Sequence, residues 1–599
     1  MHGNIYLNEL FITIIFVLGE LIEKGGLVRI ITSHVALLFI VLTMCSPVYS
    51  GQEAYISGTS IIERVHKGMD NLNVNGDTHW IRAALDARPP SIGYVESTRY
   101  LIRSHYPAVE WIERAETILH IVETSWDRQV LEMGFPPPPP DCGNGGSDHL
   151  DIYLQDLPQG IGGYAAFSCY LDDTPAADAA SFIAMSLAVG DTMLRSAVTH
   201  EFNHVLQNAI DYWETIAFKE NTATWVMDRM YDDENYYFNY LRSYQRNPDW
   251  PIHKFSTTNT YQYGGCMWVH FLAEYYGGGD PSVVVDLWQA GVQDQLHNEP
   301  DYIDALQEVI PRVSGGADTF HDALAEYAVW RTITGERDDG CHFHDGGQWS
   351  AGADVLIDTT VDLALGLPAP VSPNNEPFDY GFSYVRILNP QSVSGAVAVE
   401  FRGDPAVEWS ASLIQSTDAL TTHRVRRFDL THGSGILLLN PAMLQAAEEL
   451  TIAVVNLSDA SFDPDTGVDG TRRAYSLRFF TAQPDTALGL WPDSPMTCPG
   501  SRFGLTREIA YYGPAGSIDF WVFIEIAGLF FSLFTNPEGI PQPQTISVQP
   551  GDSITGSILD FTMPTFDSAI PLIWHAGLLQ GPLLLDYQTA RCNLVTSCR

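Results

Sequence analysis

The sequence predicts an α+β protein in which a helix-rich region containing a small sheet precedes two β-rich regions. Apolar residues recur at three- and four-residue spacing in several segments between residues 106 and 334, which is typical of helices with one buried face. Short alternating segments at 149–156 and 163–170 predict strands within this region. Beyond residue 376, alternating segments follow one another with turns at regular intervals, as in β-sandwiches. A chain of 599 residues with 45% hydrophobic content can bury several cores, so we expect three or four domains.

An export signal is predicted in residues 1–50. Arg29 precedes an apolar run at 35–44, and small residues follow up to a cleavage position after Ser50. A second apolar stretch at 10–21 lies upstream, which suggests that translation starts inside this region rather than at its first residue. We therefore expect the mature chain to be secreted or extracellular, either free or associated with the cell surface.

The composition argues against two kinds of partner. The chain has 73 Asp and Glu residues against 31 Lys and Arg residues, for a net charge of −42, whereas nucleic-acid binding requires basic surfaces. We also expect no stable membrane span in the mature chain, because the long apolar run at 520–534 contains Glu525 and is too short to cross a bilayer. The oligomeric state is left open.

The first part of the mature chain is expected to be a leader segment, residues 51–95, with a helix at 61–71. Residues 96–350 are expected to form the helix-rich domain. Within it, 106–133 has a helical apolar pattern. The proline run at 136–140 predicts a stiff extended spacer.

Three strands are expected before the central helices. They are the alternating segments 149–156 and 163–170, and the continuous apolar run 181–189, which favours a buried strand. Cys142 and Cys169 flank the first two strands. Because export permits disulfides, these two cysteines are the pair we expect to be bonded.

The remaining cysteines allow two further pairs. Cys266 with Cys341 is one prediction. Two of Cys498, Cys592 and Cys598 form the other, and Cys592 with Cys598 would close a small loop and leave Cys498 unpaired.

The most informative stretch is His200-Glu201-Phe202-Asn203-His204, an H-E-x-x-H motif. Residues four apart stack on one face of a helix, so both imidazoles can reach one zinc ion while Glu201 lies beside it as a general base. The motif also occurs by chance, so the residues around it decide whether it is a metal site. It lies in the middle of the segment 192–210, which has the apolar spacing of a helix.

A catalytic zinc normally has three protein ligands, so a third donor is expected after His204. Glu220 is our candidate, because it shares a helix-compatible run with the small residues Ala223 and Thr224, which allow close packing on the first helix. Glu214 is the nearest competitor. It follows two bulky aromatic residues, whose packing should leave its carboxylate facing solvent.

Helices are then expected up to the end of this domain, at 263–276, 281–290, 301–310 and 319–334. A proline-rich linker at 351–376 separates them from a β-sandwich domain at 376–482, with strands at 382–388, 395–401 and 450–456, and a C-terminal β-rich domain at 485–599. The apolar run at 520–534 fits strands packed in a core.

Two other segments carry metal-ligand residues. Cys341-His342-Phe343-His344-Asp345 contains an H-x-H pair that can bind copper or zinc, although its glycine- and aspartate-rich surroundings favour a disulfide or a solvated turn. Asp463, Asp465 and Asp469 have a spacing suited to structural Ca²⁺, but no terminal Glu follows, which favours an acidic hairpin.

The arrangement of these motifs resembles the gluzincin group of zinc metallopeptidases, and more narrowly the secreted bacterial peptidases of the "peptidase MA-like" type. In that type H-E-x-x-H-x-x-Q is followed by W-x-x-E-x-x-A-x-W and later by Y-x-x-G. Here these stretches are residues 200–207, 218–225 and 261–268. The chain departs from the pattern at 216–218, where the family often has tryptophan. The resemblance covers about residues 95 to 350.

The resemblance implies a zincin-like domain, in which a small mixed sheet lies beside the metal and its edge binds substrate backbone. His200, His204 and Glu220 would hold Zn²⁺, and Glu201 would accept the proton of a zinc-bound water and pass it to the leaving amine. Tyr263 is the candidate donor to the oxyanion, from its place in Tyr-Gly-Gly, with a structural tyrosine as the alternative.

The function expected from these residues is therefore a secreted zinc endopeptidase acting on protein or peptide substrates. Two alternatives stay open. One is a surface-binding or adhesive protein with a degenerate peptidase domain, which the long β-rich regions would suit. The other is a zinc hydrolase of a non-peptide substrate.

Overall fold

The computed structural model describes residues 55–67, 79–171, 174–293, 299–458, 469–482, 486–494, 496–526, 528–536, 538–563 and 570–595. The predicted export signal therefore lies outside the described residues, as do Asp463 and Asp465 of the predicted calcium segment. In the described parts of the chain, no helix has the length and apolar character needed to cross a membrane.

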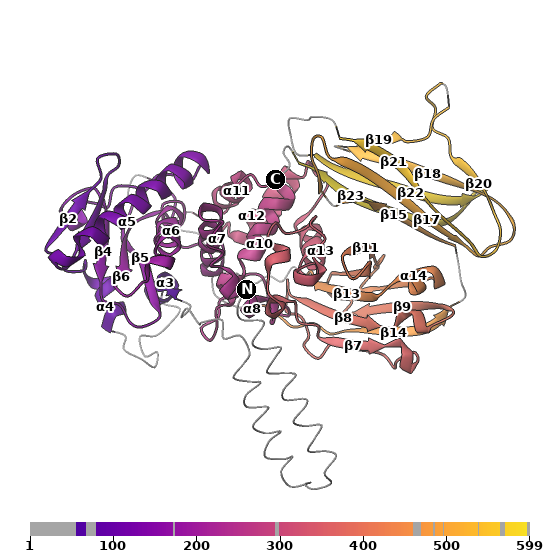
Figure 1. The fold of residues 1–599 in the computed structure, drawn as a ribbon, viewed down its shortest axis with the longest axis horizontal. Coiled ribbons are helices and arrows are strands. Elements are labelled where there is room, and N and C mark those ends of the chain that lie inside the picture. Colours follow the sequence, from indigo (N-terminus) through magenta and orange to yellow (C-terminus); the bar gives the residue numbers. More distant parts are fainter. Residues whose placement is uncertain are drawn as a thin grey trace, which may run out of the picture. The chain divides into compact units, whose positions relative to one another are not determined.

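The architecture is α+β, as predicted, and its helices and sheets follow one another in the predicted order along the chain (Figure 1). The first part, coloured indigo to purple, holds a mixed sheet with helices beside it. The magenta part that follows is helical, and the orange and yellow parts are built from β-strands.

The first sheet has six strands in the order β1-β5-β6-β4-β3-β2. Their bounds are β1 Ile56–Ser57, β2 Gly93–Glu96, β3 Ile102–Tyr106, β4 Leu150–Gln155, β5 Ile161–Tyr170 and β6 Ala179–Ser186. β5 is antiparallel to β6, whereas β1 runs parallel to β5. The three strands predicted before the central helices are thus confirmed as β4, β5 and β6, and every residue of β6 is buried.

The predicted leader is part of this sheet rather than a separate segment. Besides helices α3 (Thr59–His66) and α4 (His79–Asp86), it contributes both edge strands, β1 and β2. The predicted boundary at residue 96 falls at the end of β2. The sequence did not show this because β1 has only two residues, too few for an alternating pattern.

The helical region that follows is built around large aromatic side chains. Its elements are α6 Asp191–Asn208, α7 Ile216–Met230, α8 Phe238–Gln245, α9 Tyr261–Gly264, α10 Cys266–Phe271, η4 Leu272–Tyr276, α11 Ser282–Ala290, α12 Tyr302–Val313 and α13 Phe320–Trp330, whereas α5 Ile112–Ser125 and η2 Trp126–Glu132 lie between β3 and β4 in the chain. Phe218 of α7 stacks on Trp288 of α11 and on Tyr302 of α12, with ring centroids 4.8 and 3.9 Å apart. These stacks pack α11 and α12 against α7.

Beyond the helices, the predicted β-sandwich is confirmed as two sheets, β11-β10-β13-β8-β7 and β12-β9-β14, around a shared apolar core. The bounds are β7 Thr359–Asp362, β8 Phe382–Leu388, β9 Ala396–Gly403, β10 Trp409–Thr417, β11 Thr422–Arg427, β12 Ser434–Leu439, α14 Pro441–Ala446, β13 Glu449–Asn456 and β14 Tyr475–Ala482. β7 lies inside the predicted linker and pairs in parallel with β8, so the linker at 351–376 already contains a strand of the sandwich.

The C-terminal region is a second pair of sheets, β15-β17-β21 and β16-β23-β22-β18-β19, with β20 paired to β18. The bounds are β15 Ala487–Pro492, β16 Met496–Thr497, β17 Arg502–Tyr511, β18 Gly516–Ile526, β19 Leu529–Ser532, β20 Gln544–Val548, β21 Asp552–Thr562, β22 Ile570–Gln580 and β23 Leu583–Leu594. The apolar run at 520–534 covers the end of β18 and all of β19. Of these two strands β18 contributes to the core, whereas Leu529, Phe530 and Phe531 of β19 are exposed.

The predicted disulfides are confirmed only in part. Cys142 and Cys169 are bonded, as predicted. The pairing of Cys266 with Cys341 is wrong, because both are free thiols. Cys592 is also a free thiol, fully buried in the core of the C-terminal sheets, so it does not close a loop with Cys598. Cys498 is disulfide-bonded rather than left over.

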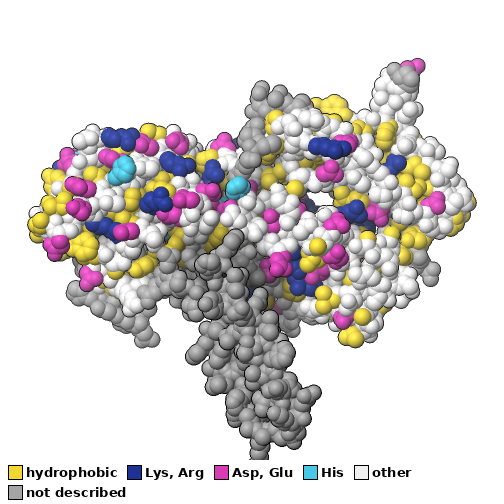
Figure 2. Space-filling model, in the orientation of Figure 1, with side chains coloured by type: hydrophobic (Ala, Val, Ile, Leu, Met, Phe, Trp, Pro, Cys, Tyr) yellow, Lys and Arg dark blue, Asp and Glu magenta, His cyan; other side chains and the backbone are white. Residues whose placement is uncertain are grey.

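The basic side chains on the surface lie close to acidic ones. On the face shown in Figure 2, Lys and Arg side chains of the described residues lie singly or in small groups beside Asp and Glu side chains. Ion pairs such as Arg103 with Glu96 and Arg99 with Asp127, both with N···O distances of 2.7 Å, are examples of such pairing among the described residues. Basic side chains are thus largely matched by acidic neighbours on this face.

Candidate metal centre

Three side chains converge on one point between α6 and α7. His204 Nε2 lies 3.0 Å from His200 Nε2 and 3.5 Å from Glu220 Oε2, and His200 Nε2 lies 3.1 Å from that same oxygen. These are the three ligands predicted from the sequence. His200 and His204 are one turn apart on α6, and the short connection 209–215 brings Glu220 of α7 opposite them.

The triangle of ligand atoms has the dimensions that a zinc ion requires. Zn–N and Zn–O bonds of about 2.0–2.1 Å at tetrahedral angles place neighbouring ligand atoms about 3.3 Å apart. The three observed separations of 3.0, 3.1 and 3.5 Å bracket this value. Two imidazoles and one carboxylate are also a donor set typical of a catalytic zinc, so the residues present fit the ion.

The surroundings of His204 fix its orientation and the position of one ring proton. Gln207 Nε2 donates to the backbone oxygen of Lys219 at 2.9 Å, which identifies the amide nitrogen and leaves Gln207 Oε1 as an acceptor. His204 Nδ1, 2.7 Å from that oxygen, must therefore carry a proton and donate it. In its neutral form this imidazole has its lone pair on Nε2, directed at His200 and Glu220, as metal ligation requires.

Two buried polar atoms at the site have no hydrogen-bond partner among the described residues. They are His200 Nδ1 and Glu220 Oε1. An unpaired buried carboxylate oxygen is costly unless a cation compensates it. Glu220 therefore has unused capacity for a ligand, whereas no outer partner orients His200 as Gln207 orients His204.

The electrostatics favour an anionic Glu220. Burial by itself would raise the pKa of its carboxyl, but the adjacent His204 and His200 outweigh burial and lower that pKa to about 2. Burial likewise opposes the charged form of His204, yet Glu220 raises the pKa of this imidazole. The carboxylate is thus charged and ready to coordinate a cation at neutral pH.

Glu201, the predicted general base, lies beside the ligands in an enclosed position. It is 2% exposed, and burial raises the pKa of its carboxyl. Its Oε2 accepts hydrogen bonds from Thr59 Oγ1 at 2.8 Å and from Ser57 Oγ at 3.2 Å. The contacts of this carboxylate oxygen thus come from the segment predicted to be a leader.

Tyr263 is close to the ligands, as predicted from the Tyr-Gly-Gly sequence. Its ring centroid is 6.1 Å from that of His200, and only 2% of the residue is exposed. Its hydroxyl accepts from the backbone N–H of Ser57 at 3.0 Å and is within 3.3 Å of the backbone oxygen of Ser57, to which it can donate. The hydroxyl is therefore placed to bond to peptide groups next to the predicted metal ligands.

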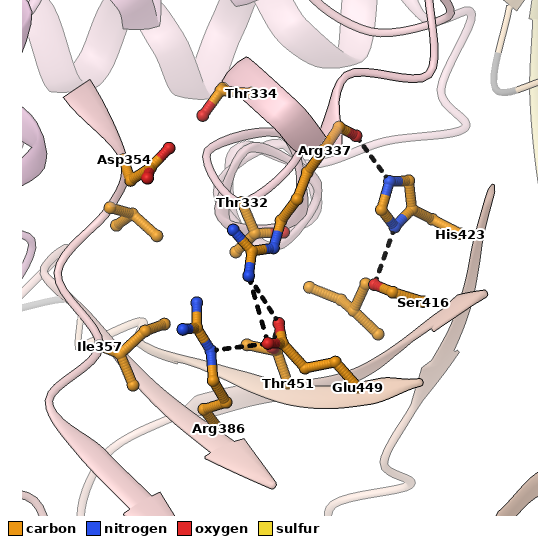
Figure 3. Close-up of a pocket in the computed structure, with 12 residues that line it drawn as sticks. Thr332, Thr334, Arg337, Asp354, Ile357, Arg386, Ser416, His423, Glu449 and Thr451 are labelled. Atoms are coloured by element: carbon orange, nitrogen blue, oxygen red, sulfur yellow. Dashed lines mark hydrogen bonds and ion pairs between the residues drawn. The ribbon is translucent and has the colours of Figure 1, made fainter. Parts of the chain in front are cut away.

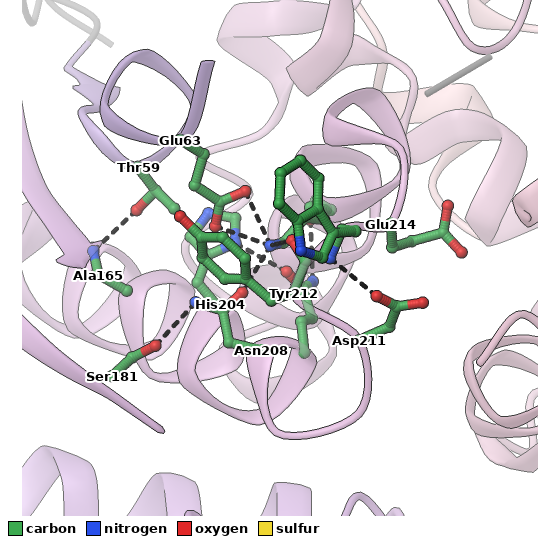
Figure 4. Close-up of polar contacts among 12 residues, drawn as sticks. Thr59, Glu63, Ala165, Ser181, His204, Asn208, Asp211, Tyr212 and Glu214 are labelled. Carbon is green, nitrogen blue, oxygen red and sulfur yellow. Dashed lines mark hydrogen bonds and ion pairs between the residues drawn. The ribbon is translucent and has the colours of Figure 1, made fainter. Parts of the chain in front are cut away.

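Next to Glu220, a buried ion pair joins α3 to α7 (Figure 4). Lys219 Nζ lies 2.7 and 2.8 Å from the two carboxylate oxygens of Glu63 and also donates to Asn208 Oδ1. Burial lowers the pKa of Lys219 to about 8 despite the attraction of Glu63. Both side chains are 1% exposed.

Glu63→Gln should destabilise the protein by about 3–5 kcal/mol, because it leaves the ammonium of Lys219 buried without its anionic partner. The control is Glu96→Gln, which removes a carboxylate that is 42% exposed and paired with Arg103 on the surface, and should cost much less. Urea unfolding of both variants at pH 7 measures this. Equal losses of stability would contradict a special role for the buried pair.

Glu214, the competing ligand, is not part of the site. Its carboxylate points away from His204 in Figure 4. The predicted solvent-facing position is wrong, however, because Glu214 is 1% exposed, and its Oε1 accepts from the N–H of Thr215 at 2.5 Å. The loop between α6 and α7 turns this side chain inward, toward Gly291.

The other predicted metal segments are weaker. His344 and Asp345 come close to Asp232, but His344 and Asp232 are exposed. Asp469, the described member of the calcium segment, forms an ion pair with Lys254, which occupies its carboxylate. A third group, Glu299, Asp301 and Asp304, includes the residues that cap the N-terminus of α12.

A small pocket elsewhere in the chain is structural in character (Figure 3). Its volume of about 10 Å³ is room for one water molecule at most. Glu449 of β13 accepts from Arg337 at 3.1 and 3.2 Å, and Arg386 Nε lies 3.1 Å from the same carboxylate. These ion pairs attach the segment after α13 to the sandwich and leave no room for a substrate.

Sequence reasoning missed the residues around the ligands. Ser57, Thr59 and Glu63 reach the site from more than 120 residues upstream of α6 and carry no motif. Gln207 was part of the H-E-x-x-H-x-x-Q stretch noted in the sequence, whereas Lys219 carries no motif and is marked only by its place next to Glu220 on the same helix.

Comparisons with known proteins add little to this geometry. No family model matches the chain, and no curated protein matches it. Among solved structures, the sporulation control protein Spo0M of Bacillus subtilis is 13% identical with a TM-score of 0.14, over 19% of this chain and 51% of that one. The β-glucuronidase of Bacteroides uniformis is 11% identical with a TM-score of 0.14, over 41% of this chain and 29% of that one.

A DUF4785 family protein from Legionella pneumophila is 11% identical with a TM-score of 0.11, over 38% of this chain and 63% of that one. The chain thus covers less than two thirds of each of these three proteins. Likenesses at such TM-scores carry no argument about fold or function.

Proposed function

We propose that this protein is a zinc-dependent hydrolase, and specifically a secreted endopeptidase that cleaves peptide bonds. The observation that carries the proposal is the convergence of His200 Nε2, His204 Nε2 and Glu220 Oε2 within 3.0–3.5 Å of one another. Glu201 on the same helix supplies the base. The predicted export signal supports the location.

Zinc held by these three residues would act as a Lewis acid on a substrate carbonyl and would acidify a water molecule. Glu201 would accept the proton of that water and later deliver it to the leaving amine, a role favoured by the raised pKa of its buried carboxyl. Tyr263 would donate from its hydroxyl to the oxygen of the scissile peptide group. Gln207 would hold the imidazole of His204 in the ligating tautomer.

A peptide is the favoured substrate because peptide groups fit the donors beside the site. The Tyr263 hydroxyl already bonds to the backbone of Ser57, and the outer edge of β5 pairs with the two-residue strand β1, the kind of backbone pairing that an extended peptide makes. A hydrolase of a small non-peptide substrate would have no use for this strand edge.

We expect purified protein to contain about one zinc per chain and to hydrolyse casein, with activity lost on treatment with 1,10-phenanthroline and restored by added Zn²⁺. Elemental analysis and release of labelled casein peptides measure this. Zinc-containing protein that hydrolyses neither casein nor a peptide library, even in a variant without the Ser57 and Thr59 hydroxyls that bond to Glu201, would point to a non-peptide substrate. Protein that takes up no zinc would favour a binding protein with a degenerate site.

A further inference from the structure

The metal centre is closed by the chain itself. His200, Glu201, His204 and Glu220 are 4, 2, 0 and 0% exposed. A peptidase must admit a polypeptide to these groups. Access of a substrate to the site therefore depends on the segment that covers these residues.

The covering segment is residues 56–60, which we name the strap. It consists of β1 and the start of α3, and its residues Ser57, Thr59 and Ser60 are 5, 1 and 2% exposed. The strap lies along β5, with hydrogen bonds from Ile56 N to Gly160 O at 2.9 Å and from Gly58 N to Gly163 O at 2.7 Å.

This is the sheet edge nearest to the predicted base. A Cβ built on Gly163 of β5 would come within 3.0 Å of Cγ of Glu201, so β5 passes directly beside that side chain. Ser57 is the strand partner of Gly163. An extended peptide that added to β5 next to Glu201 would need the place that the strap holds.

The strap also occupies the polar groups that a substrate would use. Hydroxyls of Ser57 and Thr59 donate to Glu201 Oε2, and Thr59 Oγ1 in turn accepts from the N–H of Ala165, a contact visible in Figure 4. The hydroxyl of Tyr263 bonds to the backbone of Ser57. The base, the candidate oxyanion donor and the strand edge are thus all engaged by one short segment.

We propose that the strap is an autoinhibitory element, which must leave β5 before an extended polypeptide substrate can bind there. This inference rests on the proposed peptidase function. Export processing at the predicted position after Ser50 would leave the strap in place, so secretion alone would release a closed enzyme. The strap is short and has few backbone bonds to β5. The ion pair of Glu63 with Lys219 anchors α3 beyond the strap, so residues 56–60 can leave β5 while the rest of α3 stays in place.

The test uses the full chain loaded with Zn²⁺ and the double variant Ser57→Ala/Thr59→Val, which removes both hydroxyl bonds to Glu201. The matched control is Ser392→Ala/Thr117→Val, which removes two exposed hydroxyls that bond to nearby backbone oxygens. Since a hydrogen bond to a charged group favours the closed state by roughly tenfold or more, we expect casein hydrolysis and amide exchange of the strap to rise about tenfold in the first variant only. Zinc content should be equal in all three proteins.

A second variant, Gly58→Pro, removes the N–H that bonds to Gly163. Gly58 has φ −80°, which proline accepts, and the added Cβ would lie 3.1–3.2 Å from Trp80 and Ile161, which must shift by a few tenths of an ångström. It should also raise the rate. Faster exchange of the strap with an unchanged rate of hydrolysis, or an unchanged rate in both variants, overturns the proposal while the peptidase function stands. Absence of zinc, or of hydrolysis in every variant, refutes the peptidase function instead.

Discussion

Glu201→Gln is expected to retain zinc and lose roughly 10²-fold or more of the rate of peptide hydrolysis, because an amide cannot accept the proton of the attacking water. The substitution preserves the size of the side chain. The amide oxygen of the variant would still accept hydrogen bonds from Thr59 and Ser57, so the closed packing around this position should persist.

The measurements are zinc content by elemental analysis and initial rates with labelled casein, at equal protein concentration. Glu116→Gln on the exposed side of α5 is the matched control, since it makes the same chemical change away from the metal centre. Near-wild-type hydrolysis by Glu201→Gln would remove Glu201 from the mechanism. Loss of zinc by that variant would show a structural role instead.

The convergence of His200, His204 and Glu220 was predictable from the sequence because most of its geometry is local. Two histidines four residues apart on a helix must share one face. The short connection 209–215 keeps α7 close to α6, so the two helices pack against each other. The pairing of Cys142 with Cys169 was predictable for a similar reason, since the two cysteines flank the first two predicted strands.

Burial of the central helices was underestimated. The apolar pattern of α6 predicted one buried face, but the structure also buries polar residues such as Asn203 and Gln207 on its other faces. These side chains are satisfied by one another and by Gln129 and Lys219, with Asn203 Nδ2 donating to Gln129 Oε1 at 3.0 Å. The spacing of apolar residues predicts only a face buried by apolar side chains. It cannot predict that the other faces are buried too, when the polar side chains on them form a hydrogen-bond network.

The elements that close the site were not predictable, because they act at long range. β1 is too short for a periodic signal, and it closes the site only because it pairs with β5, which is far from it in sequence. The inward turn of Glu214 depends on the loop conformation and on Gly291, which leaves space for its carboxylate. β7 was missed because it lies within residues 351–376, whose proline-rich composition indicated a linker.

Removal of Glu220 should have the largest effect on the metal. Glu220→Ala and His204→Ala should each lower the zinc content from about one per chain to nearly none, since two remaining protein ligands are too few for tight binding. Glu220 is the anionic member of the triangle, and the neighbouring histidines lower the pKa of its carboxyl to about 2. Its loss therefore removes both a ligand atom and the charge that attracts the cation.

Glu214→Ala is the matched control, because it deletes a buried glutamate from the connection between α6 and α7 that is not one of the converging side chains. Its carboxylate accepts from the backbone N–H of Thr215, so we expect a loss of stability of about 1–3 kcal/mol with zinc retained. Equilibrium dialysis against Zn²⁺, with urea unfolding in parallel, separates the two effects. Zinc retained by Glu220→Ala and lost by Glu214→Ala would reverse the ligand assignment. The structure supports Glu220 rather than Glu214 as the ligand, because Glu220 Oε2 lies within 3.5 Å of Nε2 of both His200 and His204.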